Sequence, residues 1–339
     1  MSDSPVSADS KLVFIDDTQP GITRRPRKDG WDYFDPAGAQ IADEALITRL
    51  ASVALPPAYR DAWYCPDANG HLLATGIDAR GRKQYRYHPD FRKQQESAKF
   101  DGLMQFGVSL PLIRRRVEAD LARSDLGRDR AVAAVVRLLD TGTIRVGNEA
   151  YARLNKSFGA TTLRKRHADL RGVTLRLNFR GKSGKMHNLR LTDKALLRFV
   201  RRLHDLPGQH LFQFVDAAGT PHPVGSSDVN AYLHETMGSA FSAKHFRTWG
   251  GSVTAFAALA ASREVLKLRD VLETVAQTLG NTPAIARKSY IHPDLLAIAG
   301  DKAAQVQLRD ELKLPRKTRW MSRHERGLVE FLDGIPATR

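Results

Sequence analysis

Residues 279–293 constrain the fold more than any other stretch, because signals that stop and start helices are concentrated there. Gly280 can end the preceding helix in a left-handed backbone conformation. Asn281 or Thr282 can cap the next helix, and Pro283 suits its first turn because the proline ring already holds a helical φ. The stretch therefore predicts a tight turn followed at once by a short helix.

Tyr290 stands near the C-terminal end of that short helix. Pro293 disfavours helical geometry at His292, so the helix must stop close to the tyrosine. A phenol ordinarily has a pKa of about 10 and is a poor nucleophile. Cations such as Arg287 and Lys288 can partly activate it and hold a phosphodiester product in a positive field. A half-buried aromatic residue on an ordinary helix is the alternative that this stretch alone leaves open.

Size and composition indicate a globular protein of two domains. The chain has 339 residues, of which 42% are hydrophobic and 27% are charged. No apolar run approaches the roughly 18 residues of a membrane span, and the polar N-terminus lacks a secretory signal. The single cysteine, Cys65, argues against a disulfide framework and a cysteine-based zinc site. We therefore expect a cytoplasmic protein, and no motif indicates a metal or another cofactor.

The charge indicates the kind of partner. Lysine and arginine number 53 against 37 acidic residues, which gives a net charge of +16. Such a chain is expected to bind a polyanion. The basic residues alternate with apolar ones throughout the chain, so they predict a basic face on a folded protein. A protein that only coats nucleic acid stays open at this point.

The N-terminal part predicts a small β-rich domain. Residues 1–20 are polar and predict a disordered leader. Residues 21–28 predict a basic loop that either contacts phosphates or is simply solvated. Residues 21–90 have strand character, and the charged residues 91–98 predict a linker. Residues 99–339 then form the second domain.

A β-hairpin is predicted within the N-terminal domain by turns at residues 67–70 and 79–81. Neither face of its second strand is apolar enough to be a core face, and the side chains of both faces can bond bases or phosphates. This strand predicts a sheet laid in a DNA groove. Its alternating residues are Gln84, Arg86 and His88 on one face and Lys83, Tyr85 and Tyr87 on the other.

The C-terminal part is mainly helical. The first of its helices is expected to bury Val108, Leu110, Leu112, Ile113 and Val117, and Gly142 is expected to close the second. Alternating residues 173–180 and 186–191 predict a hairpin with Lys182 in its turn. That lysine can be a mobile proton donor or a turn residue without a role. The apolar spacing predicts helices at 103–121, 129–139, 193–203, 226–237, 242–260 and 263–279, with at least one more in 301–339.

Three further cations stand in defined settings. Arg145 follows a predicted helix end and lies between Ile144 and Val146, which are expected to face the core. A rigidly held arginine of this kind suits bidentate phosphate binding. Lys244 and Arg247 open another helix and can share a face, because they are three residues apart.

The order of these cations and Tyr290 resembles the catalytic set of the type IB DNA topoisomerases, in particular the short poxviral and bacterial enzymes. The resemblance covers nearly the whole chain. Five segments carry it, namely residues 81–87 (Gly-Arg-Lys-Gln-Tyr-Arg-Tyr), 144–148 (Ile-Arg-Val-Gly-Asn), 179–182 (Phe-Arg-Gly-Lys), 244–248 (Lys-His-Phe-Arg-Thr) and 279–290.

The resemblance implies a role for each residue of the set. Tyr290 would attack a DNA phosphodiester and hold the 3′-phosphate covalently. Arg145 and Arg247 would bond its non-bridging oxygens, and Lys182 would protonate the leaving 5′-oxygen with help from Lys244. The reaction would relax supercoils without ATP or metal.

The resemblance also implies the fold class, which is α+β. A small β-rich N-terminal domain would precede a larger, mainly α-helical catalytic domain of the tyrosine recombinase and topoisomerase IB type, with a small β-hairpin sheet. The expected partner is double-stranded DNA, held by a monomer that forms a clamp, with no membrane involved and a nucleoid location in the cytoplasm. The DNA-binding candidates are Gln84, Tyr85, Tyr87, Arg82 and Tyr151.

One residue departs from the poxviral pattern. Asn281 stands where the poxviral enzymes have a histidine, and the bacterial branch commonly has asparagine. An amide can donate a hydrogen bond to a non-bridging oxygen, but it carries no charge. A plain helix cap is the other interpretation of Asn281.

A tyrosine recombinase is the alternative enzyme, since it uses the same residue types in the same fold. Its second arginine motif usually has histidine three residues before the arginine. Here that position is Lys244, and His245 is two residues before Arg247. The β-rich N-terminal domain also differs from the helical one of recombinases.

Overall fold

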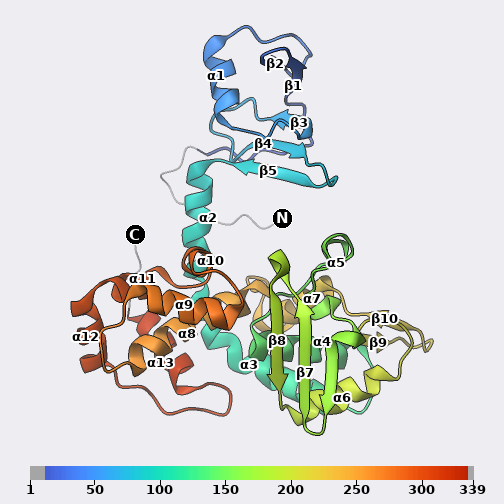
Figure 1. Cartoon of the computed structure of the whole chain (residues 1–339), viewed down its shortest axis with the longest axis vertical. Coiled ribbons are helices and arrows are strands. Elements are labelled where there is room, and N and C mark those ends of the chain that lie inside the picture. Colours follow the sequence, from blue (N-terminus) through green and yellow to red (C-terminus); the bar gives the residue numbers. More distant parts are fainter. Residues whose placement is uncertain (1–11, 335–339) are drawn as a thin grey trace. The chain divides into compact units, whose positions relative to one another are not determined.

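A computed structural model describes residues 12–334, apart from the side chains of residues 96–99. Its internal contacts divide the chain into two units, residues 1–100 and residues 101–339 (Figure 1). The first unit is built around a sheet and the second is mainly helical, so the α+β class expected from the sequence is confirmed.

The N-terminal unit is a five-stranded antiparallel sheet with the strand order β2-β1-β3-β4-β5. Helix α1 begins after Asp43, whose carboxylate caps it, and buries Leu50 against Ile22, Tyr33 and Tyr64 of the sheet. The elements are β1 (Ile22–Arg27), β2 (Gly30–Phe34), α1 (Glu44–Ser52), β3 (Arg60–Tyr64), β4 (Leu72–Ile77), β5 (Lys83–Tyr87) and α2 (Pro89–Asp101).

The segment predicted as a basic loop is strand β1, so that prediction is wrong. β1 pairs with both β2 and β3. Arg24 explains why a basic segment forms a strand here. Its guanidinium donates to the carbonyls of Leu55 and Pro56 and lies 3.9 Å from the centre of the Trp31 ring. The protein itself therefore satisfies this cation.

The end of the predicted leader is attached to the sheet. Val13 bridges Gly70, and Asp17 pairs with Lys83 at 2.7 Å. Disorder was thus wrongly predicted for residues 12–20, while residues 1–11 lie outside the described part. The predicted linker, residues 91–98, lies within helix α2.

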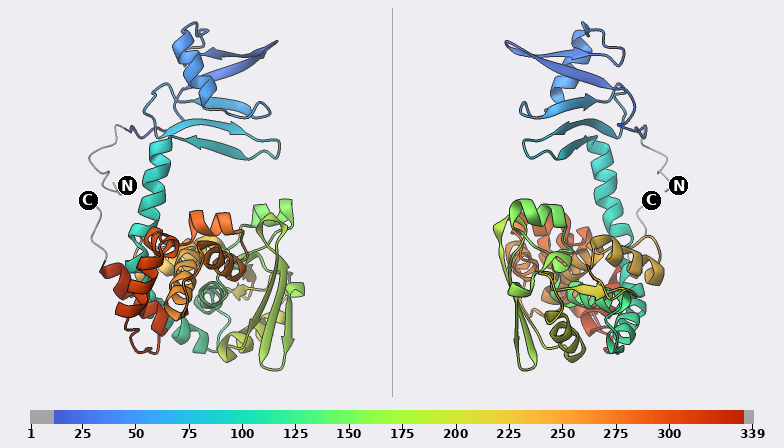
Figure 2. Two further views of the ribbon diagram at one scale, coloured as in Figure 1. Left: turned by 60° about the vertical axis from the view of Figure 1, so that its left-hand side comes forward. Right: turned by 90° about the vertical axis from the view of Figure 1, so that its right-hand side faces the viewer.

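The C-terminal unit packs eleven helices of its described part with a three-stranded antiparallel sheet, β6-β7-β8, and a two-stranded one, β9-β10. Figure 2 shows the larger sheet at the edge of this unit, beside the helices. The helices are α3 (Leu103–Ala122), α4 (Arg128–Gly142), α5 (Glu149–Asn155), α6 (Lys194–His204), α7 (Ser226–Met237), α8 (Lys244–Ala261), α9 (Leu268–Leu279), α10 (Pro283–Ser289), α11 (Pro293–Gly300), α12 (Lys302–Glu311) and α13 (Arg323–Asp333). The strands are β6 (Ala168–Arg171), β7 (Thr174–Arg180), β8 (Met186–Leu191), β9 (Gln213–Val215) and β10 (Pro221–Pro223).

Helix α4 lies in the core, and α3 and α8 pack against it. Two expectations for this region are wrong. Val108 and Leu112 of α3 are 57% and 44% exposed. Gly142 is the last helical residue of α4, and Thr143 adopts the left-handed conformation in its place, with a φ of 48°.

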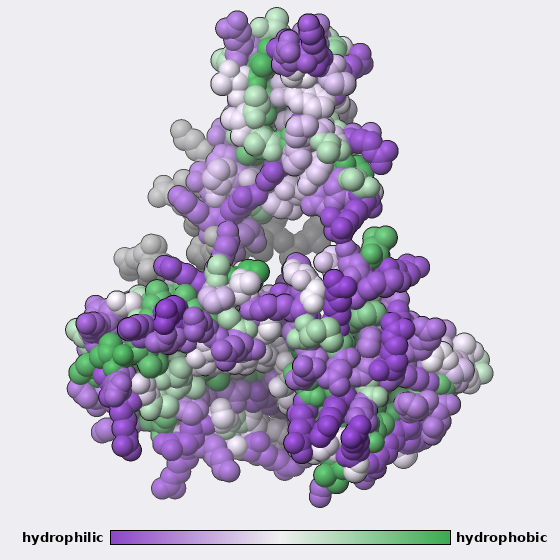
Figure 3. Space-filling model, viewed as in Figure 1, coloured by the Kyte–Doolittle hydropathy of each residue, from purple (hydrophilic) through white to green (hydrophobic). Residues whose placement is uncertain are grey.

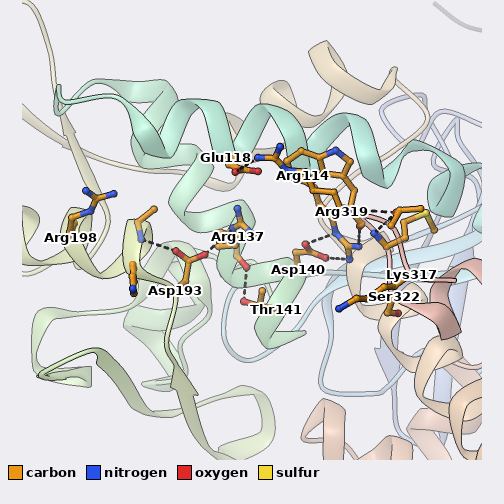
Figure 4. Close-up of a pocket in the computed structure, with 15 residues that line it drawn as sticks. Arg114, Glu118, Arg137, Asp140, Thr141, Asp193, Arg198, Lys317, Arg319 and Ser322 are labelled. Atoms are coloured by element: carbon orange, nitrogen blue, oxygen red, sulfur yellow. Dashed lines mark hydrogen bonds and ion pairs between the residues drawn. The ribbon is translucent and has the colours of Figure 1, made fainter.

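The C-terminal helix is fixed to the core by a buried ion-pair network. Arg114 of α3 bonds both carboxylate oxygens of Asp140 at 2.8 and 2.9 Å and Glu325 of α13 at 2.6 Å. It also donates to the carbonyl of Trp320. Figure 4 shows Arg114 and Asp140 at one end of a cleft between α3, α4, α6 and residues 317–322.

The visible face of the larger unit is mostly hydrophilic, with small apolar patches (Figure 3). None of the helices within residues 12–334 combines the length and apolar character needed to cross a bilayer.

Arg114→Ala should destabilise the protein, because it leaves the carboxylates of Asp140 and Glu325 buried without their cation. We expect a loss of about 3–5 kcal/mol in the free energy of unfolding, measured by urea denaturation. The control is Arg319→Ala, which removes an ion pair to Glu118 whose arginine is 71% exposed and should change stability by about 0–1 kcal/mol. Equal effects of the two variants would contradict the account.

Candidate active site

Tyr290 is placed by the turn that the sequence predicts. α9 ends at Leu279, and Gly280 follows in the left-handed conformation with a φ of 61°. The hydroxyl of Thr282 caps α10 by accepting from the amide of Ile285 at 3.3 Å. Thr282, not Asn281, is therefore the helix cap. Tyr290 follows the last residue of α10 and is half-buried.

Helix α8 holds the backbone of Tyr290 from the other side. The buried hydroxyl of Ser252 donates to the carbonyl of Tyr290 at 3.3 Å and accepts from the amide of His292 at 3.0 Å. Gly251 leaves space for this approach, since a Cβ there would stand 2.4 Å from the same carbonyl oxygen. α8 thus fixes the position from which the phenol projects.

Arg247, also on α8, is 2% exposed and lies against the tyrosine. Its Cζ is 4.7 Å from the centre of the Tyr290 ring, and the two side chains are hydrogen-bonded. Its terminal nitrogens donate to the carbonyls of Thr143 and, at 3.1 Å, Leu279. Burial lowers the pKa of Arg247 and the charge interaction with Tyr290 opposes that shift, but a guanidinium stays protonated in proteins.

Arg145 reaches the same place from the loop between α4 and α5. It donates to the side-chain oxygen of Asn281 at 3.0 Å. Its loop is held by two backbone bonds, from Ala160 to the carbonyl of Arg145 at 2.9 Å and from Thr161 to that of Val146 at 2.7 Å. The structure therefore brings together four predicted residues, Arg145, Arg247, Asn281 and Tyr290.

Two buried donors at this site have no partner among the described residues. They are Nε of Arg247 and Nδ2 of Asn281. The guanidinium of Arg145 can only donate, so its bond to Asn281 must use the amide oxygen. That bond leaves the NH₂ group of Asn281 available. Buried donors without partners are unfavourable, and an anion that accepts from both would satisfy them. The site thus fits a phosphodiester.

Lys182 begins the turn between β7 and β8, as predicted, and is exposed. Lys182 takes no part in the hydrogen bonds of Arg145 and Asn281 described above. Lys185, from the same turn, donates to the backbone carbonyl of Asn281. The hairpin is therefore joined to the tyrosine-bearing turn, although through a residue that the sequence did not single out.

Lys244 is the first residue of α8 and is exposed, whereas Arg247 is buried. The two therefore differ in burial, although they are three residues apart on the helix. Residues three apart on a helix differ in direction by about 60°, which is enough to put one in the core and the other in water.

Comparison with known proteins decides the family. Residues 88–312 match the family model described as the catalytic core of eukaryotic DNA topoisomerase I, and residues 30–78 match the N-terminal domain of bacterial DNA topoisomerase IB. The DNA topoisomerase 1B of Acanthamoeba polyphaga mimivirus is 31% identical over 285 residues, which cover 80% of this chain and 85% of that protein. The chain belongs to the type IB DNA topoisomerase family. It is thus an enzyme that acts on DNA.

Other relatives agree with this assignment. The DNA topoisomerase 1B of vaccinia virus (strain Copenhagen) is 21% identical over 275 residues, which cover 79% of this chain and 83% of that protein. A solved complex of the XerH site-specific recombinase aligns at 15% identity over 55% of this chain and 49% of that one, with a TM-score of 0.35. That likeness is too weak to favour a recombinase.

The DNA-binding candidates of the topoisomerase fall into two groups. Arg82 and Gln84 both bond the carboxylate of Asp78, at 2.7 and 2.9 Å. The bond from Arg82 is the main cause that lowers the pKa of Asp78 to about 2. Tyr85 and Tyr87 are 44% and 36% exposed. The strand therefore has one open face, not two.

The open face of β5 also carries Lys83, which the sequence analysis did not select. The rings of Tyr85 and Tyr87 stack with their centres 5.9 Å apart. Alternation showed that Lys83 shares their face, and only the structure shows that this is the exposed one. Tyr151 belongs to the other unit, where it is half-buried in α5.

No metal centre is indicated by side-chain clustering. Within residues 12–334, no group of three or more His, Cys, Asp and Glu side chains is placed to hold a metal ion.

Gly251→Ala should impair the topoisomerase without unfolding it, because the new methyl group would push the backbone of Tyr290 away. We expect formation of a covalent protein–DNA adduct on a nicked suicide duplex to slow by about 10²-fold, the scale of a small misplacement of a reacting group. The matched control is Gly300→Ala, since nothing lies within 4 Å of a Cβ there. An unchanged rate for Gly251→Ala would show that this contact does not position the tyrosine.

Proposed function

We propose that this topoisomerase nicks one strand of duplex DNA by attack of the Tyr290 hydroxyl on a phosphodiester. The tyrosine oxygen forms a bond to phosphorus, and the bond to the 5′-oxygen of the neighbouring nucleotide breaks. One phosphodiester replaces another, so the bond energy is conserved and no nucleotide is needed. The free 5′-end rotates about the intact strand, relaxes supercoils and then attacks the phosphotyrosine to reseal the nick.

The observation that carries this proposal is the contact of Arg247 with Tyr290 beside two buried donors that lack partners. A phosphate placed there would accept from Nε of Arg247 and Nδ2 of Asn281. Preorganised donors of this kind stabilise the charge that develops in a phosphoryl-transfer transition state. We assign the transition-state contacts to Arg145, Arg247 and Asn281.

Protonation of the leaving oxygen is the remaining requirement, because an alkoxide leaves poorly. We assign this role to Lys182, whose place in an exposed turn lets it reach a bound strand. An ammonium is a compact donor on a flexible stem. Lys244, at the start of α8, is assigned the assisting role.

We further propose that the protein binds duplex DNA as a monomeric clamp in the nucleoid. The net charge of +16 supports a polyanionic partner. Tyr85 and Tyr87 are assigned to DNA contact on the open face of β5. Arg82 and Gln84 remain DNA-binding candidates only if they bond DNA in addition to Asp78.

Tyr290→Phe tests the nucleophile. It removes the attacking oxygen and leaves the ring against Arg247, so plasmid relaxation should be abolished. Binding to duplex DNA should stay close to wild type with the same salt dependence, because the phosphate contacts are intact. A variant that still relaxes supercoiled plasmid would exclude Tyr290 as the nucleophile.

The same assay separates the two enzyme classes. A topoisomerase relaxes plasmid that lacks paired recombination sites. Strand exchange between two specific sites, with no relaxation, would instead assign the protein to the recombinases.

Lys182→Ala tests the general acid. Cleavage of a suicide duplex should slow by roughly 10²–10⁴-fold, the usual contribution of a positioned acid. A duplex with a 5′-sulfur leaving group needs no protonation and should restore most of the rate. Lys182 would lose the acid role if the thiolate leaving group gave no recovery.

A further inference from the structure

His187 lies between two of the segments that carry the proposed chemistry. It is the second residue of β8 and pairs with Phe179 of β7. Its ring stacks on the Phe179 ring, with centres 5.1 Å apart and planes 8° from parallel. This stack fixes the orientation of the imidazole.

The edges of the imidazole touch the residues that precede Lys182 and Asn281. A Cβ on Gly181 would stand 2.5 Å from Cδ2 of His187, and a Cβ on Gly280 would stand 2.5 Å from its Cε1. Real Cβ atoms do not approach other atoms so closely. The ring therefore fills the space between the Lys182 turn and the Asn281 turn, and both neighbours must be glycine as long as it is there.

A second contact joins the same two turns. Lys185 donates from its ammonium to the backbone carbonyl of Asn281, and its own carbonyl accepts from the amide of Gly181 at 2.7 Å. Lys185 draws the turns together, while the ring of His187 keeps them apart. The pair sets the separation between the hairpin and the tyrosine-bearing turn.

The imidazole is suited to this place because it stays neutral there. Burial lowers the pKa of His187 most, and the cations Arg247, Arg145 and Lys185 lower it further. A neutral ring fills the space without adding a charge to the phosphate site.

We propose that His187 is a positioning residue that holds the Lys182 hairpin at a set distance from the Asn281 turn and so directs the general acid at the leaving oxygen. This inference rests on the acid role proposed for Lys182. It assigns no contact between His187 and the DNA.

The test is single-turnover cleavage by His187→Ala on two suicide duplexes that differ only in the leaving atom. With the 5′-oxygen, cleavage should slow by about 10- to 100-fold, because the acid is misplaced and not removed. With the 5′-sulfur, the rate should return to near that of wild type on the same duplex. His222→Ala is the control, since His222 pairs with Asp216 on a separate sheet, and it should cleave both duplexes like wild type.

His187→Phe guards against a folding defect in the alanine variant. Phenylalanine keeps a stacked ring, slightly larger than imidazole, and loses the nitrogens, so a spacer predicts cleavage of the 5′-oxygen duplex much closer to the wild-type rate than that of His187→Ala. A slow His187→Phe variant that the sulfur duplex does not restore would overturn the proposal.

Gly181→Ala gives a measurement that leaves His187 in place. Gly181 has a φ of −93°, which any residue can adopt, so alanine there acts only by its contact with the ring. The single variant should show a slowed cleavage that the sulfur duplex restores. Adding His187→Ala removes the clash, so the double variant should be faster than the product of the two single effects predicts.

The outcomes separate this proposal from the proposed function. If the 5′-sulfur duplex restores the cleavage rate of Lys182→Ala but not that of His187→Ala or Gly181→Ala, the positioning role of His187 is wrong and the acid role of Lys182 stands. If it restores none of them, both roles are wrong. Independent, multiplying effects of Gly181→Ala and His187→Ala would also overturn the spacer role.

Discussion

The site depends on one buried cation, the guanidinium of Arg247. It bonds the carbonyls of Thr143 and Leu279, which stand at the C-terminal ends of α4 and α9, and it lies against Tyr290. Helix C-termini carry partial negative charge and unsatisfied carbonyls, so they stabilise a cation that has left water. The same bonds bring the ends of two helices to the first turn of a third, α8, and the turn at Gly280 places the tyrosine there.

This arrangement leaves the site with more donors than acceptors. Nδ2 of Asn281 and Nε of Arg247 are buried and lack partners among the described residues. A bound phosphodiester would accept hydrogen bonds from both donors and so remove the cost of burying them without partners. It would also be held where the phenol can reach phosphorus. The stability given up at these two donors thus supports binding of the reacting group, which is the usual relation between strain and function at active sites.

Local signals predicted much of this from the sequence. Glycine and proline fixed the ends of α10, and alternation located the β7–β8 hairpin, because both patterns act within a few residues. What failed depends on distant partners. Gln84 and Arg82 are held by Asp78, β1 forms because Arg24 finds acceptors elsewhere, and Val108 lies off the buried stripe of α3. His187 gave no signal, since its role follows from two glycines 99 positions apart, at 181 and 280.

The most direct test of the account is to identify the residue that becomes joined to DNA. The covalent complex would be trapped on a suicide duplex, digested with protease and nuclease, and analysed by mass spectrometry. The account predicts a single modified peptide in which the oxygen of Tyr290 carries the 3′-phosphate of the cleaved strand. Attachment to another residue, or to a 5′-phosphate, would contradict it.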